Sequence, residues 1–489
     1  MKKFTWLIRF ALFAAMLSAC AAPATSVPTQ PPASTEAIAA PTAAVTAPPA
    51  TSGTQKPFDG ETVTIISHGP PQSPAIFEFQ DQFYQETGIK VNVIELAPEA
   101  MYEKIVTELT SGSGAVDIVE IQPQWLPDVA RFLEPIDPLI KENNLDFQMN
   151  DFFPAALNPY GTWDKTLYGI PWATDVHGLY YRKDIFEKPE IQQKYKEKYN
   201  SDLKPPATWD EYKQIAEFFT GWDWGLGDGV TRYGTAEHLA RGRVYWWFLN
   251  RFGGFGGVYF DENMKPMVNS EAGIKSLQNM VDVVPFMPPA ALSFGAPEAR
   301  AAYLNGDTAM LINWVSSWTA AEEVKNGQMG FAPLPNKNSS YAGAWDLAVT
   351  KDSKHKGAAA TFIWWYSKPD ISLQIKMGPY GLAPTRPSQL DSQEFITNFP
   401  YGHGSDYLQS YEENVLQGYP DLLIPGAAEY MDSLDLNITV ALAKEATVQE
   451  ALDKTAAEWD AITDRLGRDQ QTQFWLQQFE TMKQLNIIK

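Results

Sequence analysis

The chain has one cysteine, Cys20, among its 489 residues, and it has no excess of basic side chains. No disulfide within the chain can therefore stabilise the fold, which must rely on its apolar core. The net charge of −21 excludes nucleic acid and anionic lipid headgroups as main partners, because no basic stripe offsets it. Long apolar runs are missing too: the run from Phe10 to Leu17 is far shorter than the roughly 20 residues of a membrane-spanning helix.

Motifs of hydrolytic and metal chemistry are also missing. The five histidines are scattered without a pair at metal-ligand spacing, and neither a zinc motif nor a nucleophile elbow occurs. No repeat of the solenoid type is present. The sequence therefore predicts no metal and no cofactor.

The first twenty residues, MKKFTWLIRFALFAAMLSAC, have the pattern of a secretory signal. Basic residues precede a short apolar stretch that ends in small residues. The last four residues, Leu17 to Cys20, resemble the bacterial lipobox, in which the cysteine becomes the diacylated first residue of the mature protein. We therefore predict a signal peptide over residues 1–19 and a lipid anchor at Cys20, which holds the protein on the outer face of the bacterial cell membrane.

Residues 20–57 are Ala, Pro, Thr and Ser with hardly a charge. Such a segment has too little apolar bulk to offset the entropy lost on ordering, and its prolines keep it extended. We predict a disordered tether between the lipid and the folded part. The rest of the chain, about 430 residues, is too long for one ordinary core and predicts two domains.

Sixteen tryptophans are an unusual number, and most of them must belong to the core. Hydrophobic residues at 44% and charged residues at 20% are typical of a folded soluble protein. A tryptophan in a loop, beside Gly, Pro or polar residues, is a candidate platform for a ligand. This description fits Trp125, Trp172, Trp314, Trp318 and Trp345.

Strand and helix patterns alternate from residue 62 onward. Residues 62–67, 89–96 and 116–121 are predicted strands, and apolar residues recur at helical intervals between them. This β-α-β-α-β order implies a parallel sheet with right-handed crossovers. Ligands bind such sheets at the carboxyl ends of the strands, where the loops here are residues 67–73 and 122–127.

The later part of the chain continues the alternation. We predict a strand from Thr308 to Ile312, a helix of about twelve residues from Lys356, and a late helix with Thr447 as N-cap. Glu450 completes a capping box there. The fold class is therefore α/β.

Six segments, in this order, resemble the extracellular solute-binding protein family 1, which includes the maltodextrin-binding protein. They are FYQETGIKVNV, GSGAVDIVEIQPQW, YGIPWATDVHGLYYRKDIF, LNGDTAMLIN, AWDLAVTKDSKHKGAAATFIWWYSKPD and TVQEALDKTAAEW. Each match is loose by itself, but together they span nearly the whole chain after the tether.

The resemblance implies the two-lobed periplasmic-binding-protein fold of type II. Each lobe is a mixed, mainly parallel sheet flanked by helices, and a multi-strand hinge of three chain crossings joins them. The first lobe is expected over residues 58–174 and 340–384, and the second over 175–335 and 385–489. A monomer of this kind binds a neutral sugar, oligosaccharide or polyol between its lobes, closes about the hinge and delivers the ligand to the permease subunits of an ABC importer.

Sugar recognition needs flat aromatic faces and planar polar groups that bond neighbouring hydroxyls. The loops and crossings offer both kinds of side chain. The predicted ligand contacts are His68, Gln72, Gln122, Gln124, Trp125, Trp172, Asp175, Trp314, Trp318, Trp345, Asp346, Tyr380 and Arg386. In the family, an acidic residue six positions before the tyrosine of the LYY-x-K-D motif contacts bound sugar, and Asp175 stands at that position. Arg386 also fits a structural ion pair at the hinge, and His177 fits a buried, hydrogen-bonded histidine.

The sequence departs from the maltodextrin-binding member at two loops. That member has charged side chains where this chain has Pro70 and Pro71. It has an aspartate and an arginine where this chain has Gln124 and Trp125. These departures argue against assigning maltose as the ligand.

Two alternatives stay open at this point. A cell-surface glycoside hydrolase or lyase would use two carboxylates across the scissile bond, and Asp175 and Asp346 are the available pair. The same fold could also bind a non-sugar solute such as ferric ion, a polyamine or a phosphorylated polyol. Tyr180 and Tyr181 face opposite sides of a strand and so do not readily ligate one ion, and Arg386 is nearly the only cation for an anionic ligand.

Overall fold

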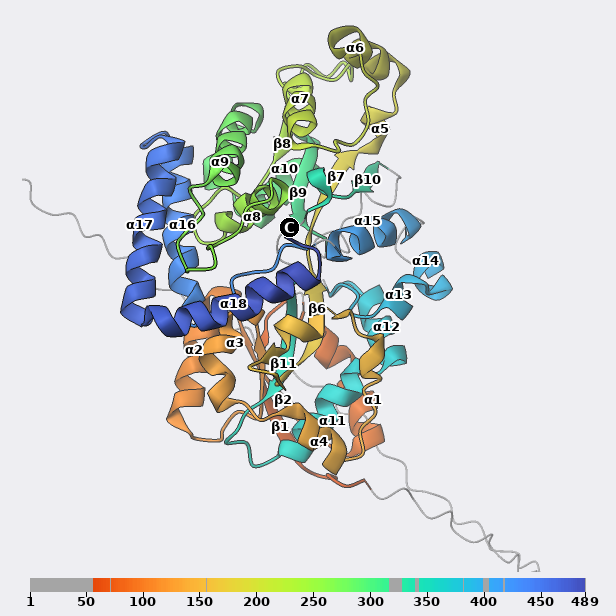
Figure 1. Cartoon of the computed structure of the whole chain (residues 1–489). Helices are drawn as coiled ribbons and strands as arrows, with labels where there is room; N and C mark the ends of the chain where they lie inside the picture. The colour runs from red at the N-terminus through yellow and green to blue at the C-terminus, as the bar shows by residue number, and fades with distance from the viewer. Residues whose placement is uncertain are drawn as a thin grey trace, which may run out of the picture. The chain divides into compact units, whose positions relative to one another are not determined.

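A computed structural model gives the fold of residues 56–70, 72–154, 156–315, 328–338, 343–380, 382–398, 404–416 and 418–488 (Figure 1). The predicted signal peptide, Cys20, the tether up to residue 55, and Trp318 lie outside these described residues. Within them, no helix combines the length and the apolar character that crossing a membrane requires.

The first sheet has five strands in the order β2-β1-β3-β11-β6. These are β1 (Thr62–His68), β2 (Lys90–Leu96), β3 (Ile118–Ile121), β6 (Gly169–Asp175) and β11 (Gly343–Val349). β1 pairs in parallel with β2 and β3, whereas β11 is antiparallel to both β3 and β6. Therefore four strands run one way and β11 runs the other, as expected for a mixed, mainly parallel sheet.

The second sheet has four strands in the order β10-β7-β9-β8. These are β7 (His177–Arg182), β8 (Tyr233–Ala236), β9 (Thr308–Trp314) and β10 (Met329–Ala332). β7 is antiparallel to both β9 and β10, and β8 is parallel to β9, so β7 alone opposes the other three. A separate hairpin pairs β4 (Thr162–Trp163) with β5 (Thr166–Leu167).

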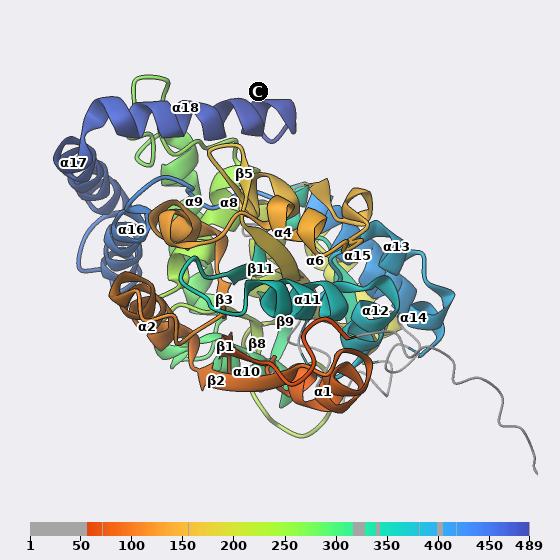
Figure 2. The ribbon, with the colours of Figure 1, turned by 90° about the horizontal axis from the view of Figure 1, so that it is seen from below.

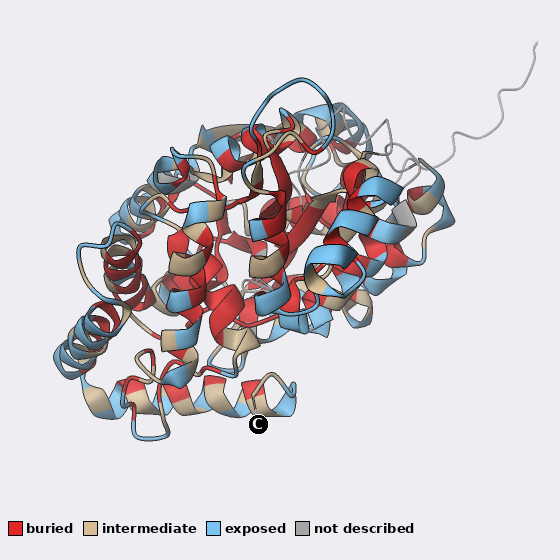
Figure 3. Cartoon of the chain, turned by 90° about the horizontal axis from the view of Figure 1, so that it is seen from above, coloured by how far each residue is buried: buried red, intermediate tan, exposed pale blue. Residues whose placement is uncertain are grey.

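Helices cover the sheets, and Figure 3 shows the strands buried beneath helices whose outer faces are exposed. The α-helices of residues 74–142 and 356–377 are α1 (Pro74–Thr87), α2 (Pro98–Ser111), α3 (Leu126–Val129), α4 (Ile136–Glu142), α11 (Lys356–Ser367) and α12 (Pro369–Met377). The others are α5 (Lys183–Phe186), α6 (Pro189–Tyr199), α7 (Trp209–Phe219), α8 (Val244–Gly254), α9 (Glu271–Val283), α10 (Ala296–Leu304), α13 (Pro387–Leu390), α14 (Gln393–Asn398), α15 (Gly404–Leu416), α16 (Ala427–Leu442), α17 (Val448–Leu466) and α18 (Arg468–Gln484).

The predicted helix boundaries agree with the structure where local signals are strong. α1 ends at Gly88, whose φ of 76° is left-handed and whose N–H bonds the Tyr84 carbonyl. α11 begins at Lys356 and has 12 residues. The capping box of α17 is present, with the Thr447 side chain accepting from the Glu450 N–H.

One stretch of chain builds both sheets. β6 ends at Asp175 and β7 begins at His177, so Val176 alone separates a strand of the first sheet from a strand of the second. The Thr174 hydroxyl donates to the carbonyl of Pro384, and Tyr411 donates to the same carbonyl at 2.6 Å. The segment near residue 384 is therefore fixed to this crossing. The residues at which each lobe begins and ends remain a prediction.

The C-terminal helix α18 holds a loop that precedes α16. The Gln478 amide bridges this loop, accepting from the Leu423 N–H at 2.8 Å and donating to the Asp421 carbonyl at 2.6 Å, and Gln471 donates to the Pro425 carbonyl. The Phe474 ring packs 4.8 Å from Trp163 of the β4–β5 hairpin. Figure 2 shows α18 at the edge of the described residues, beyond this hairpin. α18 thus connects residues 421–425 with a hairpin that precedes the first crossing.

A buried ion pair fixes α8, the helix that carries Trp246 and Trp247. Arg251 donates to both carboxylate oxygens of Glu237, at 2.8 and 3.0 Å, and neither side chain is exposed. Arg251 also donates to Asn279 and lies over the Trp209 ring, 4.2 Å from its centroid. Glu237 accepts a third bond from Tyr212.

We expect Arg251→Met to lower the free energy of unfolding by about 3–5 kcal/mol, because it leaves the Glu237 carboxylate buried without its cation. Urea unfolding measures this loss. As a control, Lys196→Ala removes an exposed pair with Asp202 and should cost less than about 1 kcal/mol. Equal losses for the two variants would contradict the structural role of Arg251.

Candidate functional site

Three aromatic rings meet where β1 and β3 end and β11 begins. The His68 ring centroid lies 5.3 Å from that of Trp345, and the Trp345 centroid lies 5.9 Å from that of Trp125, both edge to face. The two tryptophans are buried and His68 is half-buried. The sequence predicts a ligand contact for each of these residues, and the structure brings all three together.

Glutamine amides lie at the same strand ends. Gln124 donates to the side-chain oxygen of Gln122 at 2.7 Å. The side-chain oxygens of Gln124 and Gln72 are buried and have no hydrogen-bond partner among the described residues. A buried amide oxygen without a partner costs about 1–3 kcal/mol, so natural structures keep few of them without a reason. A bound hydroxyl that donates to these oxygens would remove that cost.

A polar network lies beneath the loop that follows β1. Glu120, in β3, accepts from the Ser67 hydroxyl at 2.5 Å and from the His68 N–H at 3.0 Å. Burial raises the pKa of Glu120 to about 7 and lowers the pKa of Lys376 to about 7. Lys376 donates to the Trp172 carbonyl, and its ammonium lies 5.2 Å from the Trp172 ring centroid. The network fixes the loop that carries His68.

Trp172 and Asp346 lie in the first sheet without a described partner for their side-chain polar atoms. The Trp172 indole packs near Tyr366 of α11, with ring centroids 6.0 Å apart, and its N–H is unpaired among the described residues. Asp346 is fully buried, both of its carboxyl oxygens are unpaired there, and burial raises its pKa well above 3.8. Its Cβ packs where a side chain on Gly169 would stand. Asp346 is therefore a carboxyl group inside the sheet, where burial favours its neutral form.

Asp175 ends β6 at the crossing, opposite Gly343 of β11, and is 8% exposed. Burial first, and the Asp175 charge to a smaller extent, raise the pKa of both Tyr180 and Tyr411 well above 10. The carboxylate therefore lies among side chains of the second half of the chain. This position between the two sheets suits a hydrogen-bond acceptor at a hinge.

Arg386 and Tyr380 lie apart from the aromatic cluster. Arg386 is fully buried and donates to the carbonyls of Phe147, Gln148 and Ser367, in addition to an ion pair with Asp151. These bonds give it the structural role that the sequence left open. The half-buried Tyr380 ring packs over Gly378, where any Cβ would meet it. The structure does not bring either residue together with Trp125 and Trp345.

Trp314 belongs to a second aromatic cluster, on the second sheet. The centroid of the His177 ring lies 4.0 Å from that of Trp314 and 4.2 Å from that of Trp247. The His238 ring stacks on Trp247, with centroids 4.9 Å apart. Burial lowers the pKa of His177 to about 3 and that of His238 to about 4, so both are neutral at physiological pH. His177 is the buried histidine expected from the sequence, bonded to Asn250.

Asp421 is a residue of this region that the sequence analysis missed. It is 2% exposed, one carboxyl oxygen accepts from the Trp246 indole N–H at 3.0 Å, and the other has no partner among the described residues. Trp246 itself lies edge to face with Trp314 at 5.0 Å. The one available signal in the sequence was a single acid between Pro420 and the apolar run Leu422 to Ile424. An aspartate is rarely buried in an apolar segment without a specific partner or role.

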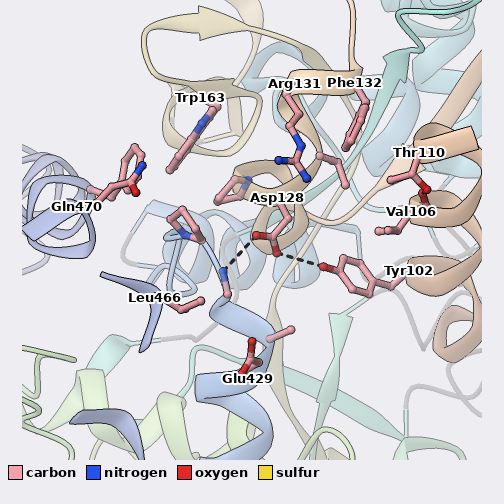
Figure 4. Close-up of a pocket in the computed structure, with 16 residues that line it drawn as sticks. Tyr102, Val106, Thr110, Asp128, Arg131, Phe132, Trp163, Glu429, Leu466 and Gln470 are labelled. Atoms are coloured by element: carbon pink, nitrogen blue, oxygen red, sulfur yellow. Dashed lines mark hydrogen bonds between the residues drawn. The ribbon is translucent and has the colours of Figure 1, made fainter. Parts of the chain in front are cut away.

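The two regions adjoin. α16 packs against η1 (Pro123–Trp125), the turn that follows β3. The Asp128 carboxylate accepts from the Gly426 N–H at 3.2 Å and from the Tyr102 hydroxyl at 3.1 Å (Figure 4). The loop that carries Asp421 therefore runs beside the loop that carries Gln122, Gln124 and Trp125.

This arrangement is suited to binding. It combines aromatic edges and faces with amide and carboxyl acceptors, which is the chemistry of a polyhydroxylated ligand. Among the described residues, no group of three or more His, Cys, Asp and Glu side chains is placed to hold a metal ion. The tyrosine pair considered for iron is separated, since Tyr180 packs against Phe331 and Tyr181 against Phe186.

Comparisons with known proteins define the class. The sequence model described as "Bacterial extracellular solute-binding protein" matches residues 78–400. A probable amino-acid ABC transporter periplasmic-binding protein of Sinorhizobium fredii is 26% identical over 357 residues, covering 71% of this chain and 77% of the relative. The arabinooligosaccharide-binding protein of Halalkalibacterium halodurans is 24% identical over 363 residues, covering 70% and 73%.

The fold is similar to that of a solved binding protein. An ABC transporter solute-binding protein of Agrobacterium radiobacter, determined with ribitol, superposes with a TM-score of 0.70 at 24% identity, covering 83% of this chain and all of that one. The two-lobed periplasmic-binding-protein fold expected from the sequence is thereby confirmed.

The fold and the matches define a solute-binding protein of two lobes, and the chain belongs to the bacterial extracellular solute-binding protein family. The family and these relatives are solute-binding proteins and not enzymes, which settles the alternative of a glycoside hydrolase. They support the predicted role of substrate-binding component of an ABC importer. The family is extracellular, so the chain acts outside the cytoplasm.

We expect Asp421→Asn to change how stability depends on pH. Because burial raises the pKa of Asp421 from 3.8 to about 7, the folded protein keeps a proton that the unfolded chain releases near pH 4. The free energy of unfolding of the wild type therefore falls as the pH rises through this window. Asparagine does not titrate, so the variant should gain on the order of 2 kcal/mol relative to wild type between about pH 4.5 and 8.

Urea unfolding at both pH values measures the difference. Asp432→Asn is the control, because the Asp432 side chain is 68% exposed and its substitution removes an acid without removing a buried carboxyl group. A gain that is the same at both pH values would contradict the burial of a titrating Asp421.

Proposed function

We propose that the protein captures a neutral sugar, oligosaccharide or polyol between its lobes and delivers it to the permease subunits of an ABC importer. The observation that carries this proposal is the cluster at the ends of β1 and β3, where Trp125 and Trp345 meet edge to face and the loops that follow these strands carry the buried amide oxygens of Gln72 and Gln124, which have no partner among the described residues. Aromatic faces bind the C–H surface of a sugar ring, and amide oxygens accept from its hydroxyls.

The charges in this region favour a neutral ligand. Lys376, the buried cation beside Trp172, donates to a backbone carbonyl, and Arg386, which lies apart from the aromatic cluster, donates to three, so neither contributes an open donor pair for an anion. Glu120 is held by Ser67 and His68. Two relatives support the sugar or polyol class, since one is an arabinooligosaccharide-binding protein and the other was determined with ribitol.

An amino acid is the competing ligand, because another relative is named as a probable amino-acid binding protein. An amino acid presents an ammonium and a carboxylate together, and its recognition needs charged partners on both sides. The cluster of Trp125, Trp345, Gln72 and Gln124 offers stacking and neutral acceptors instead.

Hinge closure would couple binding to transport. Ligand contacts with both lobes would shift an open–closed equilibrium toward the closed form, which docks on the permease. The β6–β7 crossing carries Asp175, so a ligand bonded to this carboxylate would contact the hinge itself. The protein would work as a monomer, held at the outer face of the cell membrane by acyl chains on Cys20 and by the tether that follows.

We expect Trp345→Ala and Asp175→Ala each to weaken binding of the ligand by about tenfold or more, because each removes a side chain that we propose to contact the ligand directly. The ligand is first found by a thermal-shift screen of monosaccharides, oligosaccharides, polyols and amino acids, since a ligand at 100 times its Kd adds about 2.7 kcal/mol of stability. Titration calorimetry then measures Kd for each variant.

Two controls separate binding from folding. Trp364→Ala removes a tryptophan of α11 that bonds the Asp146 carbonyl, and Asp432→Asn changes an exposed acid, so both should keep wild-type affinity. Wild-type affinity in both Trp345→Ala and Asp175→Ala would refute the proposed site. A screen in which only amino acids stabilise the protein would refute the proposed ligand class.

We expect Cys20→Ser to release the protein from membranes, because serine cannot accept the thioether-linked diacylglyceryl group. Cell fractionation and metabolic labelling with a radioactive fatty acid measure the effect: the wild type should be labelled and sediment with membranes, and the variant should be unlabelled. Ligand affinity should not change, since Cys20 precedes the folded residues. A labelled variant would contradict lipidation at this cysteine.

A further inference from the structure

A groove of about 640 Å³ lies beside the predicted ligand site, between α2 and α3 on one side and residues 425–429 and α18 on the other. The volume falls in the range of ligand pockets, roughly 300–1,000 Å³. In Figure 4 the side chains of Tyr102, Trp163, Glu429 and Gln470 surround Asp128 at the centre of the groove. No local pattern in the sequence predicts this groove, because its walls come from residues 102–163 and 425–474.

One wall of the groove packs against the aromatic cluster of the proposed site. The ring of Tyr102, in its wall, lies 5.5 Å from the ring of Trp125. Trp125 in turn lies 5.9 Å from Trp345. Two residues, Leu126 and Pro127, separate Trp125 from Asp128 along the chain, and the loop that holds Asp421 enters the groove at Pro425. The groove and the aromatic cluster are therefore neighbours, close enough for successive units of one oligosaccharide to contact both.

The lining has the composition that a sugar unit requires. Tyr102, Phe132, Trp163 and Phe474 contribute half-buried aromatic rings, and Asp128, Arg131, Glu429 and Gln470 contribute planar polar groups. Such planar groups bond two neighbouring hydroxyls at once.

Asp128 is oriented before any ligand binds. Its two oxygens accept from the Tyr102 hydroxyl and from the Gly426 N–H, which come from opposite walls of the groove. Burial raises its pKa, while the bonds from Gly426 and Tyr102 oppose that shift. A carboxylate has about four acceptor positions, so these two bonds leave acceptor capacity for a hydroxyl.

Trp163 has the position of a stacking platform. It is half-buried at the tip of the β4–β5 hairpin, and the Phe474 ring packs 4.8 Å from it with planes 33° apart. Packing on Phe474 fixes the indole, so little entropy is lost when a ring stacks on it.

We infer that this groove is a second sugar subsite, in which the outer units of an oligosaccharide lie against Trp163 and bond Asp128. The inference rests on the proposed function and narrows it: the preferred ligand is an oligosaccharide, and free monosaccharides and polyols fill only the inner site at Trp125 and Trp345. The other occupant to consider is a partner protein packed on the aromatic wall, and the experiment distinguishes it.

The test compares short and long members of one sugar series. The full-length protein is screened against arabino-, malto-, xylo-, cello- and manno-oligosaccharides, each as the monosaccharide and as chains of up to six units. For the series that binds, titration calorimetry gives Kd at each length for wild type, Trp163→Ala and Trp163→Phe. Trp222→Ala is the matched control. Trp222 is also half-buried, but it follows α7 and donates to the Phe218 carbonyl, and it does not line the groove.

The wild type should bind the longer chains more tightly than the monosaccharide. Trp163→Ala should weaken the longer chains by about tenfold while leaving the monosaccharide unchanged, and Trp163→Phe should recover part of the loss. Trp222→Ala should match the wild type at every length.

Three outcomes would overturn the inference and leave the proposed function standing. In the first, the wild type binds all lengths equally or binds only monosaccharides or polyols. In the second, Trp163→Ala keeps the full gain from chain length, as expected if the groove holds a partner protein. In the third, the variant weakens all lengths in parallel, as expected if Trp163 only supports the fold. Absence of binding to any sugar or polyol would overturn the proposed function itself.

Discussion

The structure depends on a constraint at Val176, the single residue between β6 and β7. Because a strand can belong to only one sheet at a time, the chain must leave the first sheet and enter the second within one residue. Every other contact of the crossing follows from this: β11 lies against β6, Thr174 and Tyr411 share the Pro384 carbonyl, and Asp175 lies among side chains of both halves. A hinge of this kind can bend at the crossing without breaking the pairing of either sheet.

Buried polar groups distinguish the site from the rest of the core. Glu120, Asp346, Asp421 and Lys376 are all less than 3% exposed. Burial raises the pKa of the three acids and lowers the pKa of Lys376, so it favours the neutral form of each group. A fold selected for stability alone would place apolar side chains there. The Glu237–Arg251 pair differs, because each of its groups has a full set of bonds and serves to hold α8. By contrast, Glu120, Asp346 and Asp421 each keep at least one carboxyl oxygen without a partner among the described residues.

Much of the fold was accessible from the sequence, because its signals are local. Helical spacing and Gly88 define α1, the Thr447–Glu450 box defines the start of α17, and alternation with helices predicts the parallel strands of the first sheet. The site was accessible only in part. His68 and Trp125 lie at or just after the ends of β1 and β3, Trp345 lies near the start of β11, and all three could be grouped from the sequence. The bonds of Arg386, the fully buried position of Asp346 and the proximity of Asp421 to Trp246 arise instead from contacts over long sequence distances. No periodicity or spacing encodes such contacts.

The register shift in β11 between Trp345 and Asp346 has a consequence for divergence within the family. The irregularity separates the part of the strand that presents Trp345 from the part, Leu347 to Val349, that is locked between β3 and the core. Substitutions before the shift can therefore exchange one recognition surface for another without moving the strand behind it. A scaffold built in this way can retain its architecture among relatives that share only a quarter of their residues, while the compounds they import diversify.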